Sequence, residues 1–539
     1  MRIQPLALFR SALAASLTLC ALLFFLWTWH WPLVGDASLM HYIVFLIERG
    51  WAPYRQFGDM NMPGSYLVEF AAMHVFGGGA LGLRLFDFFL LTVAGLSFFA
   101  IVRAAPRRPT IADHPGLAAL FATSLFILIH GRDGIPQGGQ RDLTMAVCLI
   151  AATAFLVYAL RQRSIVGAAS FGLLSGVAFT IKPTAPLLTI AQLALTTYVL
   201  RPAEDERPRR SSLLASSLLG CLVAPAVALI FLLREHALAA FASTLHTFVP
   251  YYASLGHKPL SFVVLHSLSP ILPLVILWIA LLAVQPSTSA APRNRSRDLL
   301  LLGAAFGLLN CIIQARALPY YRYTLLAFLL PLLAMDLVRA LDFALTSPSP
   351  RTARNRAALI LSSLGLAFGA FVLAPQSAYL IHSYGWRQTD FISSLESNLQ
   401  TLGGQLLSHK ILCIDTNAGC GNVLYLMRLE PSTGMLSDFF LFGDQNAPAV
   451  RIAREQLSQS LAADPPQVMV VTSGLYLGGP DTLGYGKLQR WPQFATYIAS
   501  HYELAAQWTP TRRMRWWSRE ETPASYRIYV LRSSPQPHP

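Results

Sequence analysis

The sequence predicts a mainly α-helical, polytopic membrane bundle of about eleven spans followed by a small extracytoplasmic α/β domain. Of the 539 residues, 54% are hydrophobic and only 13% are charged, with a mean hydropathy of +0.47. A soluble domain carries about 25% charged residues. This composition excludes a single soluble domain, a disordered chain and a disulfide-stapled miniprotein. The net charge of +14 is interpreted as membrane topology, because no nucleic-acid-binding module accompanies it.

Apolar runs long enough to cross a bilayer recur along the first 380 residues. Each is predicted to be a helix, because the hydrocarbon offers no water to bond a bare backbone. The first run follows a basic start, as in a signal peptide, but its length and its tryptophan cluster favour a retained span. The runs lie at 9–30, 83–102, 116–131, 142–160, 165–181, 184–200, 212–234, 262–284, 298–314, 323–342 and 357–380.

The distribution of Lys and Arg predicts a cytoplasmic N-terminus. With this orientation the inner connections are richer in basic residues than the outer ones, although the outer ones are longer. After eleven crossings the tail lies on the outer side of the membrane; an error of one span would place it in the cytoplasm. We therefore expect a membrane domain at 1–380, with its first outer loop at 31–82, and an outer domain at 381–539.

The tail alternates strand-like and helix-like stretches, which is typical of a small α/β domain. Cys413 and Cys420 lie in this tail, where an oxidising compartment permits either a bridge or two free thiols. The segment NAGCGN lacks the spacing of a nucleotide-binding loop and is interpreted as a glycine-rich turn. The expected strands are HKILCIDT, PPQVMVVTS, YELAAQW and YRIYVLR, and the expected helices are RIAREQLSQSLAA and PQFATYIASHY.

The first outer loop carries the candidate chemistry. Asp36 follows the aromatic end of the first span, and residues 37–49 form a helix too short to cross the bilayer, so it lies along the interface. Proline and glycine residues then break the chain around Asp59, before a second short helix at about 65–76.

An aspartate after glycine, an interfacial helix, the segment PYRQFGDMNMPG and a returning helix together resemble GT-C glycosyltransferases over roughly residues 10–340. The nearest branch is the bacterial one that includes protein O-mannosyltransferases, aminoarabinose transferases of lipid A and rhizobial lipopolysaccharide glycosyltransferases. The resemblance therefore implies a bacterial plasma membrane, with the tail in the periplasm or extracellular space. The resemblance implies a sugar donor on a polyprenyl phosphate such as undecaprenyl phosphate. It also implies transfer, usually with inversion, to the hydroxyl of a glycan, lipid or protein on the outer face.

Two carboxylates are the catalytic candidates. The resemblance gives Asp36 the place of the essential acid, which takes the proton of the attacking hydroxyl. The structural alternative for Asp36 is the N-cap of a helix. Many relatives have a second acid next to it, where this chain has Ala37. For Asp59 three functional roles are open: orienting the acceptor, binding the sugar or ligating a metal. The structural alternative is a solvated turn residue. No metal motif of His or Cys is present, so a divalent ion would depend on Asp36, Asp59 or Asp142.

Cations at the outer ends of spans are expected to hold the donor phosphate and stabilise the charge that develops on it. Each also has a structural explanation: snorkelling for Lys182, helix-end pairing for Arg141 and Asp142, and interface anchoring for the tyrosines. Arg322, within an aromatic cluster, is the strongest candidate. The full donor-binding set is Lys182, Arg322, Tyr321, Tyr323, Arg141, Asp142 and the weaker Arg55.

Two other classes fit many spans and charged rims. A secondary transporter or lipid-carrier flippase would favour internal repeats and polar groups at mid-membrane, neither of which is evident. A non-catalytic assembly factor would use the tail to bind a partner and would tolerate replacement of every acid in the outer loop.

Overall fold

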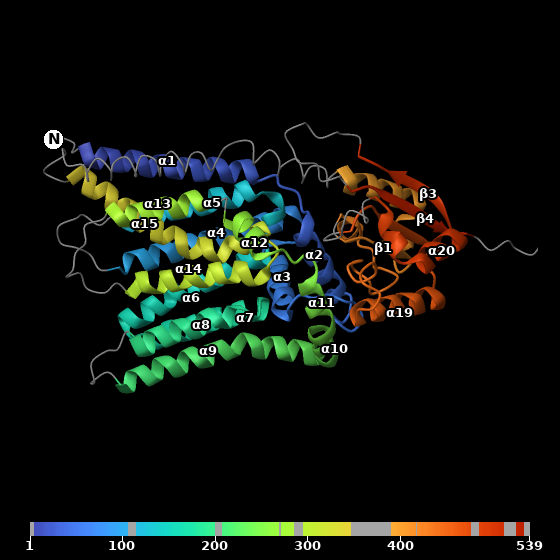
Figure 1. Ribbon diagram of the computed structural model, residues 1–539, viewed down its shortest axis with the longest axis horizontal. Coiled ribbons are helices and arrows are strands. Elements are labelled where there is room, and N and C mark those ends of the chain that lie inside the picture. Colours follow the sequence, from blue (N-terminus) through green and yellow to red (C-terminus); the bar gives the residue numbers. More distant parts are fainter. Residues whose placement is uncertain are drawn as a thin grey trace, which may run out of the picture.

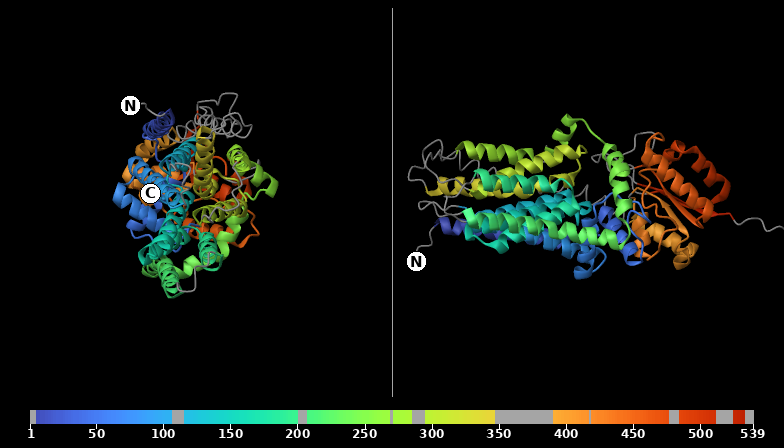
Figure 2. Two further views of the ribbon diagram at one scale, coloured as in Figure 1. Left: turned by 90° about the vertical axis from the view of Figure 1, so that its left-hand side faces the viewer. Right: turned by 90° about the horizontal axis from the view of Figure 1, so that it is seen from below.

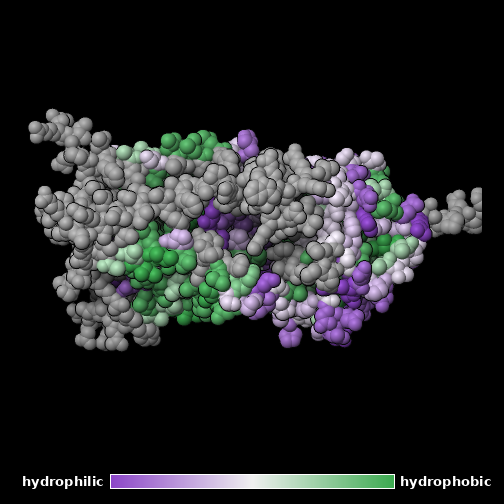
Figure 3. All heavy atoms as spheres, turned by 45° about the horizontal axis from the view of Figure 1, so that its top comes forward, coloured by the Kyte–Doolittle hydropathy of each residue, from purple (hydrophilic) through white to green (hydrophobic). Residues whose placement is uncertain are grey.

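The computed structural model describes residues 5–105, 115–199, 207–268, 271–284, 295–346, 390–416, 418–475, 484–510 and 524–532. A bundle of long, roughly parallel helices occupies one end of the molecule, and a domain containing a sheet occupies the other (Figures 1 and 2). Figure 3 shows hydrophobic residues gathered on the bundle and hydrophilic residues on the C-terminal domain, as expected when only the bundle meets lipid.

The bundle is built from the apolar runs of the sequence. Its helices are α1 (Pro5–Thr28), α4 (Ala80–Arg103), α5 (Pro115–Asp133), α6 (Arg141–Gln162), α7 (Ile165–Ile181), α8 (Ala185–Ala194), α9 (Arg207–Arg234), α12 (Leu260–Leu268), α13 (Leu272–Val284), α14 (Arg295–Gln314) and α15 (Tyr323–Thr346). A π-helical turn, η2 (Leu195–Val199), extends α8.

The predicted helical character of the bundle is confirmed, whereas the number of eleven spans is not. Within the described ranges, six helices are long and apolar enough to cross a membrane: Ala80–Arg103, Gly116–Asp133, Arg141–Gln162, Ser211–Arg234, Arg295–Gln314 and Pro319–Ala340. The single run expected at 262–284 contains two helices, α12 and α13. The run expected at 357–380 falls outside the described residues.

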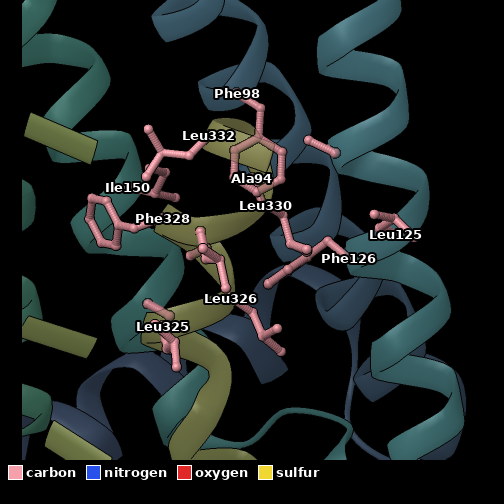
Figure 4. Close-up of a cluster of buried hydrophobic side chains, with 14 of the residues drawn as sticks. Ala94, Phe98, Leu125, Phe126, Ile150, Leu325, Leu326, Phe328, Leu330 and Leu332 are labelled. Carbon is pink, nitrogen blue, oxygen red and sulfur yellow. The ribbon is translucent and has the colours of Figure 1, made fainter. Parts of the chain in front are cut away.

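Helix α15 forms the centre of the bundle. Its leucines and Phe328 interdigitate with Phe98 of α4, Phe126 of α5 and Ile150 of α6 (Figure 4). On one flank α7 crosses α9 so closely that a side chain at Gly172 would collide with the backbone of Ser217. Small residues at such crossings let membrane helices approach and pack.

Short helices form a layer between the bundle and the C-terminal domain (Figure 1). They are α2 (Gly35–Glu48), α3 (Pro63–Phe76), α10 (Leu238–Ser243), the π-helical turn η4 (Thr244–Phe248) and α11 (Val249–Ser254). The interfacial helices predicted at 37–49 and 65–76 correspond to α2 and α3. This layer carries the outer loop, so the candidate carboxylates lie at the end of the bundle that faces the domain.

The C-terminal domain has a four-stranded sheet in the order β1-β2-β4-β3. Strands β1 (Ile411–Ile414) and β2 (Val468–Thr472) are parallel, while β4 (Tyr526–Leu531) runs antiparallel to both β2 and β3 (Tyr502–Trp508). One face packs on α19 (Pro448–Ala463) and α20 (Pro492–His501); the other packs on α18 (Cys420–Leu426) and, through it, on α2. Every strand and both helices expected in the tail are confirmed. The two tail cysteines, left open by the sequence, form a disulfide between β1 and α18.

Candidate functional site

Asp36 lies in the first turn of α2 and faces the start of α6. Its Oδ2 accepts hydrogen bonds from Arg141 Nη2 at 2.9 Å and from Gln140 Nε2 at 3.3 Å. The side chain retains 26% of its exposure, so a substrate can reach the carboxylate. The N-cap of α2 is Val34, so Asp36 is not the cap that its position allowed. The bond to a cation from another helix instead fixes its orientation.

Asp59 is connected to the same arginine through Asn61. Arg141 donates to the side-chain oxygen Oδ1 of Asn61, and Asn61 Nδ2 donates to Asp59 Oδ2 at 2.6 Å. Tyr66 of α3 donates its hydroxyl to the same Asp59 oxygen at 2.7 Å. Burial, followed by the negative charge of Asp59, raises the pKa of Tyr66 well above its ordinary value, so the hydroxyl stays protonated. Asp59 is therefore held by two neutral donors rather than left as a solvated turn residue.

Lys182 lies at the C-terminal end of α7. Its Nζ bonds Asp142 Oδ1 at 2.6 Å and Gln314 Oε1 at 2.7 Å, and it stands 4.9 Å from the centre of the Tyr321 ring. Lys182 also interacts electrostatically with Arg141. Arg141 and Asp142 are consecutive residues at the start of α6. Since Arg141 pairs with Asp36 and Asp142 pairs with Lys182, the start of α6 connects Asp36 to Lys182.

Arg316 is a third cation of this region, and the sequence analysis did not select it. It is 8% exposed, its guanidinium stacks 4.1 Å from the Tyr252 ring centre, and it donates to the Tyr252 carbonyl oxygen. It interacts electrostatically with Lys182. No carboxylate pairs with it among the described residues, so its charge remains available to an anion. Its position in the connection before the YYRY cluster is the signal that points to it.

We call the following residues the rim cluster: Asp36, Asp59, Asn61, Arg141, Asp142, Lys182, Gln314 and Arg316. They come from α2, α6, α14 and the connections of the domain-facing end.

Three expected site residues lie elsewhere. Arg322 is buried and donates to Asp133 at 3.0 Å, so its charge is already compensated. The hydroxyl of Tyr323 lies against His130, within the bundle. Arg55 is exposed. These side chains are not part of the rim cluster. Tyr321, by contrast, supports Lys182 with its ring.

The carboxylates do not fit a divalent cation. Asp36 faces Arg141, Asp142 faces Lys182, and Asp59 accepts from two neutral donors. Over the described part of the chain, no three side chains of His, Cys, Asp or Glu gather as metal ligands. The chemistry of this site is therefore derived without a metal.

The C-terminal domain touches both connections that carry the rim cluster. Gly58 donates its N–H to the carbonyl of Gly434 at 3.2 Å, one residue before Asp59. On the other side, Tyr252 of α11 packs its ring against Phe439, 5.4 Å away between centres. The domain thus contacts the backbone beside one acid and the aromatic platform of Arg316.

The glycine-rich turn after β1 already holds an anion of its own. The N–H groups of Ala418, Gly419 and Cys420 donate to the carboxylate of Asp415 at 2.8–3.1 Å. A side chain therefore occupies the donors that a nucleotide phosphate would need, which agrees with interpreting the segment as a turn.

The structure thus places a partly exposed carboxylate near three cations at the domain-facing end of a bundle of apolar helices. Solved structures share the fold. ArnT from Cupriavidus metallidurans bound to undecaprenyl phosphate matches with a TM-score of 0.56 and 14% identity, covering 95% of this chain and 97% of that chain. The archaeal oligosaccharyltransferase AglB from Archaeoglobus fulgidus, with an inhibitory peptide and a dolichol-phosphate, matches with a TM-score of 0.51 and 12% identity, covering 98% and 75%.

Both proteins are GT-C glycosyltransferases, so the chain has the GT-C fold, as its resemblance predicted. At these identities the likeness establishes the fold alone. No protein-family model and no curated protein matches the sequence.

Proposed function

We propose that this protein is an integral membrane glycosyltransferase that moves a sugar from a polyprenyl phosphate to an acceptor hydroxyl on the outer face of the membrane. The observation that carries the proposal is the Asp36–Arg141 pair, 2.9 Å apart, at the end of a cationic row that continues through Lys182 to Arg316. A base beside several cations suits a reaction in which an alcohol attacks and a phosphate leaves.

In the proposed reaction the acceptor oxygen attacks the anomeric carbon from the face opposite the phosphate. A new C–O bond forms while the bond from that carbon to the phosphate oxygen breaks, and its electron pair remains on the phosphate. The hydroxyl proton passes to Asp36. This displacement inverts the anomeric centre, as expected from the resemblance.

The cations divide the work of holding the leaving group. Arg141 contacts Asp36 and Asn61 in the absence of substrate, and we expect it to turn toward the donor phosphate, which uncovers Asp36 for the acceptor. Lys182 supplies a point charge and Arg316 a planar fork. In this proposal Arg316 takes the role that the sequence analysis gave to Arg322. ArnT bound to undecaprenyl phosphate supports a lipid-phosphate donor for a chain of the same fold.

Purified full-length protein in liposomes, supplied with a panel of labelled undecaprenyl-phosphate sugars and envelope extracts, tests the function. We expect a new glycosidic product and stoichiometric release of undecaprenyl phosphate. Movement of labelled lipid between leaflets without any glycosidic product would instead establish the flippase, and refute the proposal.

A further inference from the structure

Two side-chain amides near the end of α14 have buried nitrogen atoms without a hydrogen-bond partner among the described residues. They belong to Asn310 and Gln314, which lie one helical turn apart on the same face. Asn310 is fully buried. Native proteins rarely keep such donors unmet unless a ligand or an ordered water bonds them.

The partners of the two amide oxygens indicate which half of each amide is free. Gln314 Oε1 accepts from the ammonium of Lys182 at 2.7 Å, and an ammonium group can only donate. Asn310 Oδ1 accepts from the Thr184 hydroxyl at 3.0 Å. The ammonium fixes the orientation of Gln314, whose free half is therefore its NH₂ group. The Thr184 hydroxyl can donate or accept, and in the observed arrangement it donates to Asn310, which leaves the NH₂ group of Asn310 free. The corner between α7, α8 and α14 thus offers donors and one positive charge.

We propose that Asn310 and Gln314, together with Lys182, bind the non-bridging oxygens of a phosphate group, and that this group is the headgroup of the polyprenyl carrier. The inference rests on the proposed function and adds two neutral donors to its cations. A phosphate oxygen only accepts, as this corner requires, whereas a sugar hydroxyl must also donate. The corner lies at the end of a membrane-length helix, the depth that a lipid headgroup reaches.

The test measures binding of three probes to the full-length protein in nanodiscs: undecaprenyl phosphate, inorganic phosphate and the uncharged undecaprenol. Gln314→Glu keeps an acceptor for Lys182 but replaces the free donors with a carboxylate oxygen. Asn310→Leu removes the other amide at similar volume. Ser175→Ala is the control, because Ser175 is another buried side chain without a partner in the described part of the chain, but lies seven residues before Lys182 on α7.

We expect each of the two amide variants to weaken undecaprenyl phosphate binding by about tenfold or more, with undecaprenol and the control unchanged. Thermal melting establishes that the variants are folded. Gln314 is only partly buried, so Gln314→Glu keeps the test decisive if Asn310→Leu does not fold.

Wild-type affinity in both folded variants would overturn the inference and assign the amides to ordered water. Equal affinity for inorganic phosphate and undecaprenyl phosphate would overturn the lipid assignment. If the wild-type protein transfers sugar and both variants bind the carrier normally, only this inference is refuted. If the wild-type protein neither binds the carrier nor transfers sugar, the proposed function is refuted as well.

Discussion

Replacing Asp36 by Asn isolates the role of the base from that of the fold. Asparagine keeps an oxygen that can accept from Arg141 and Gln140, so these two contacts of the side chain are retained in neutral form. A partly exposed ion pair of this kind contributes about 0.2–1 kcal/mol to stability. We therefore expect the melting temperature to change little.

The loss in rate is expected to be much larger. A positioned general base contributes about 10²–10⁴-fold, which corresponds to about 3–5 kcal/mol in the activation barrier. Single-turnover release of undecaprenyl phosphate from a donor that the wild-type protein uses measures the chemical step directly. Arg141 stays in place in the variant, so donor binding should remain close to that of the wild type.

Asp444→Asn provides the matched control, since Asp444 is an exposed acid of the C-terminal domain beside α11 but outside the rim cluster. It should transfer sugar at the wild-type rate. The base assignment is refuted if Asp36→Asn, folded and loaded with donor, retains more than about a tenth of the wild-type single-turnover rate.

Three further outcomes follow from contacts described above. Arg316→Gln should raise the KM for the lipid donor about tenfold or more without changing the melting temperature, and an unchanged KM would remove Arg316 from the donor site. Replacing Cys413 and Cys420 together by Ser should lower the free energy of unfolding by about 2 kcal/mol, measured by denaturant titration, because the unfolded chain loses a short closed loop; no loss would refute that account. Lys487→Met should cost about 3–5 kcal/mol in the same assay, since it leaves the buried carboxylate of Asp438 unpaired, and adding Asp438→Asn should restore part of the loss.

Hydropathy was sufficient to predict most of the bundle, because spanning the membrane is a local requirement on each apolar run. The run at 262–284 shows where this fails: its composition is apolar throughout, yet its described residues form two helices, α12 and α13, each too short to cross a bilayer alone. The tail strands were equally predictable, since each is a short apolar segment bounded by turn residues. Their order in the sheet is set by pairings distant in sequence, which a single sequence does not show.

The site was harder to predict, because an arginine can bind a ligand anion only when no carboxylate of the protein already pairs with it, and that pairing depends on the tertiary structure. Arg322 and Arg316 look alike in sequence, six residues apart near the same aromatic cluster. Only the fold brings Asp133 of α5 against Arg322, while Arg316 stacks on Tyr252. Asp36 was selected through the family resemblance, and its pairing with Arg141 is a tertiary contact between α2 and α6.

If the proposed transfer to an acceptor is correct, the close fit at Gly434 has a practical consequence for the design of variants that use other acceptors. A methyl group there would collide with the backbone at Gln56, so the C-terminal domain fits closely against the outer loop at this position. Grafting a C-terminal domain from a distant homologue would disturb the chain next to Asp59 before any new specificity could emerge. Libraries that vary surface loops of the resident domain, and leave this junction untouched, are the better route to altered products.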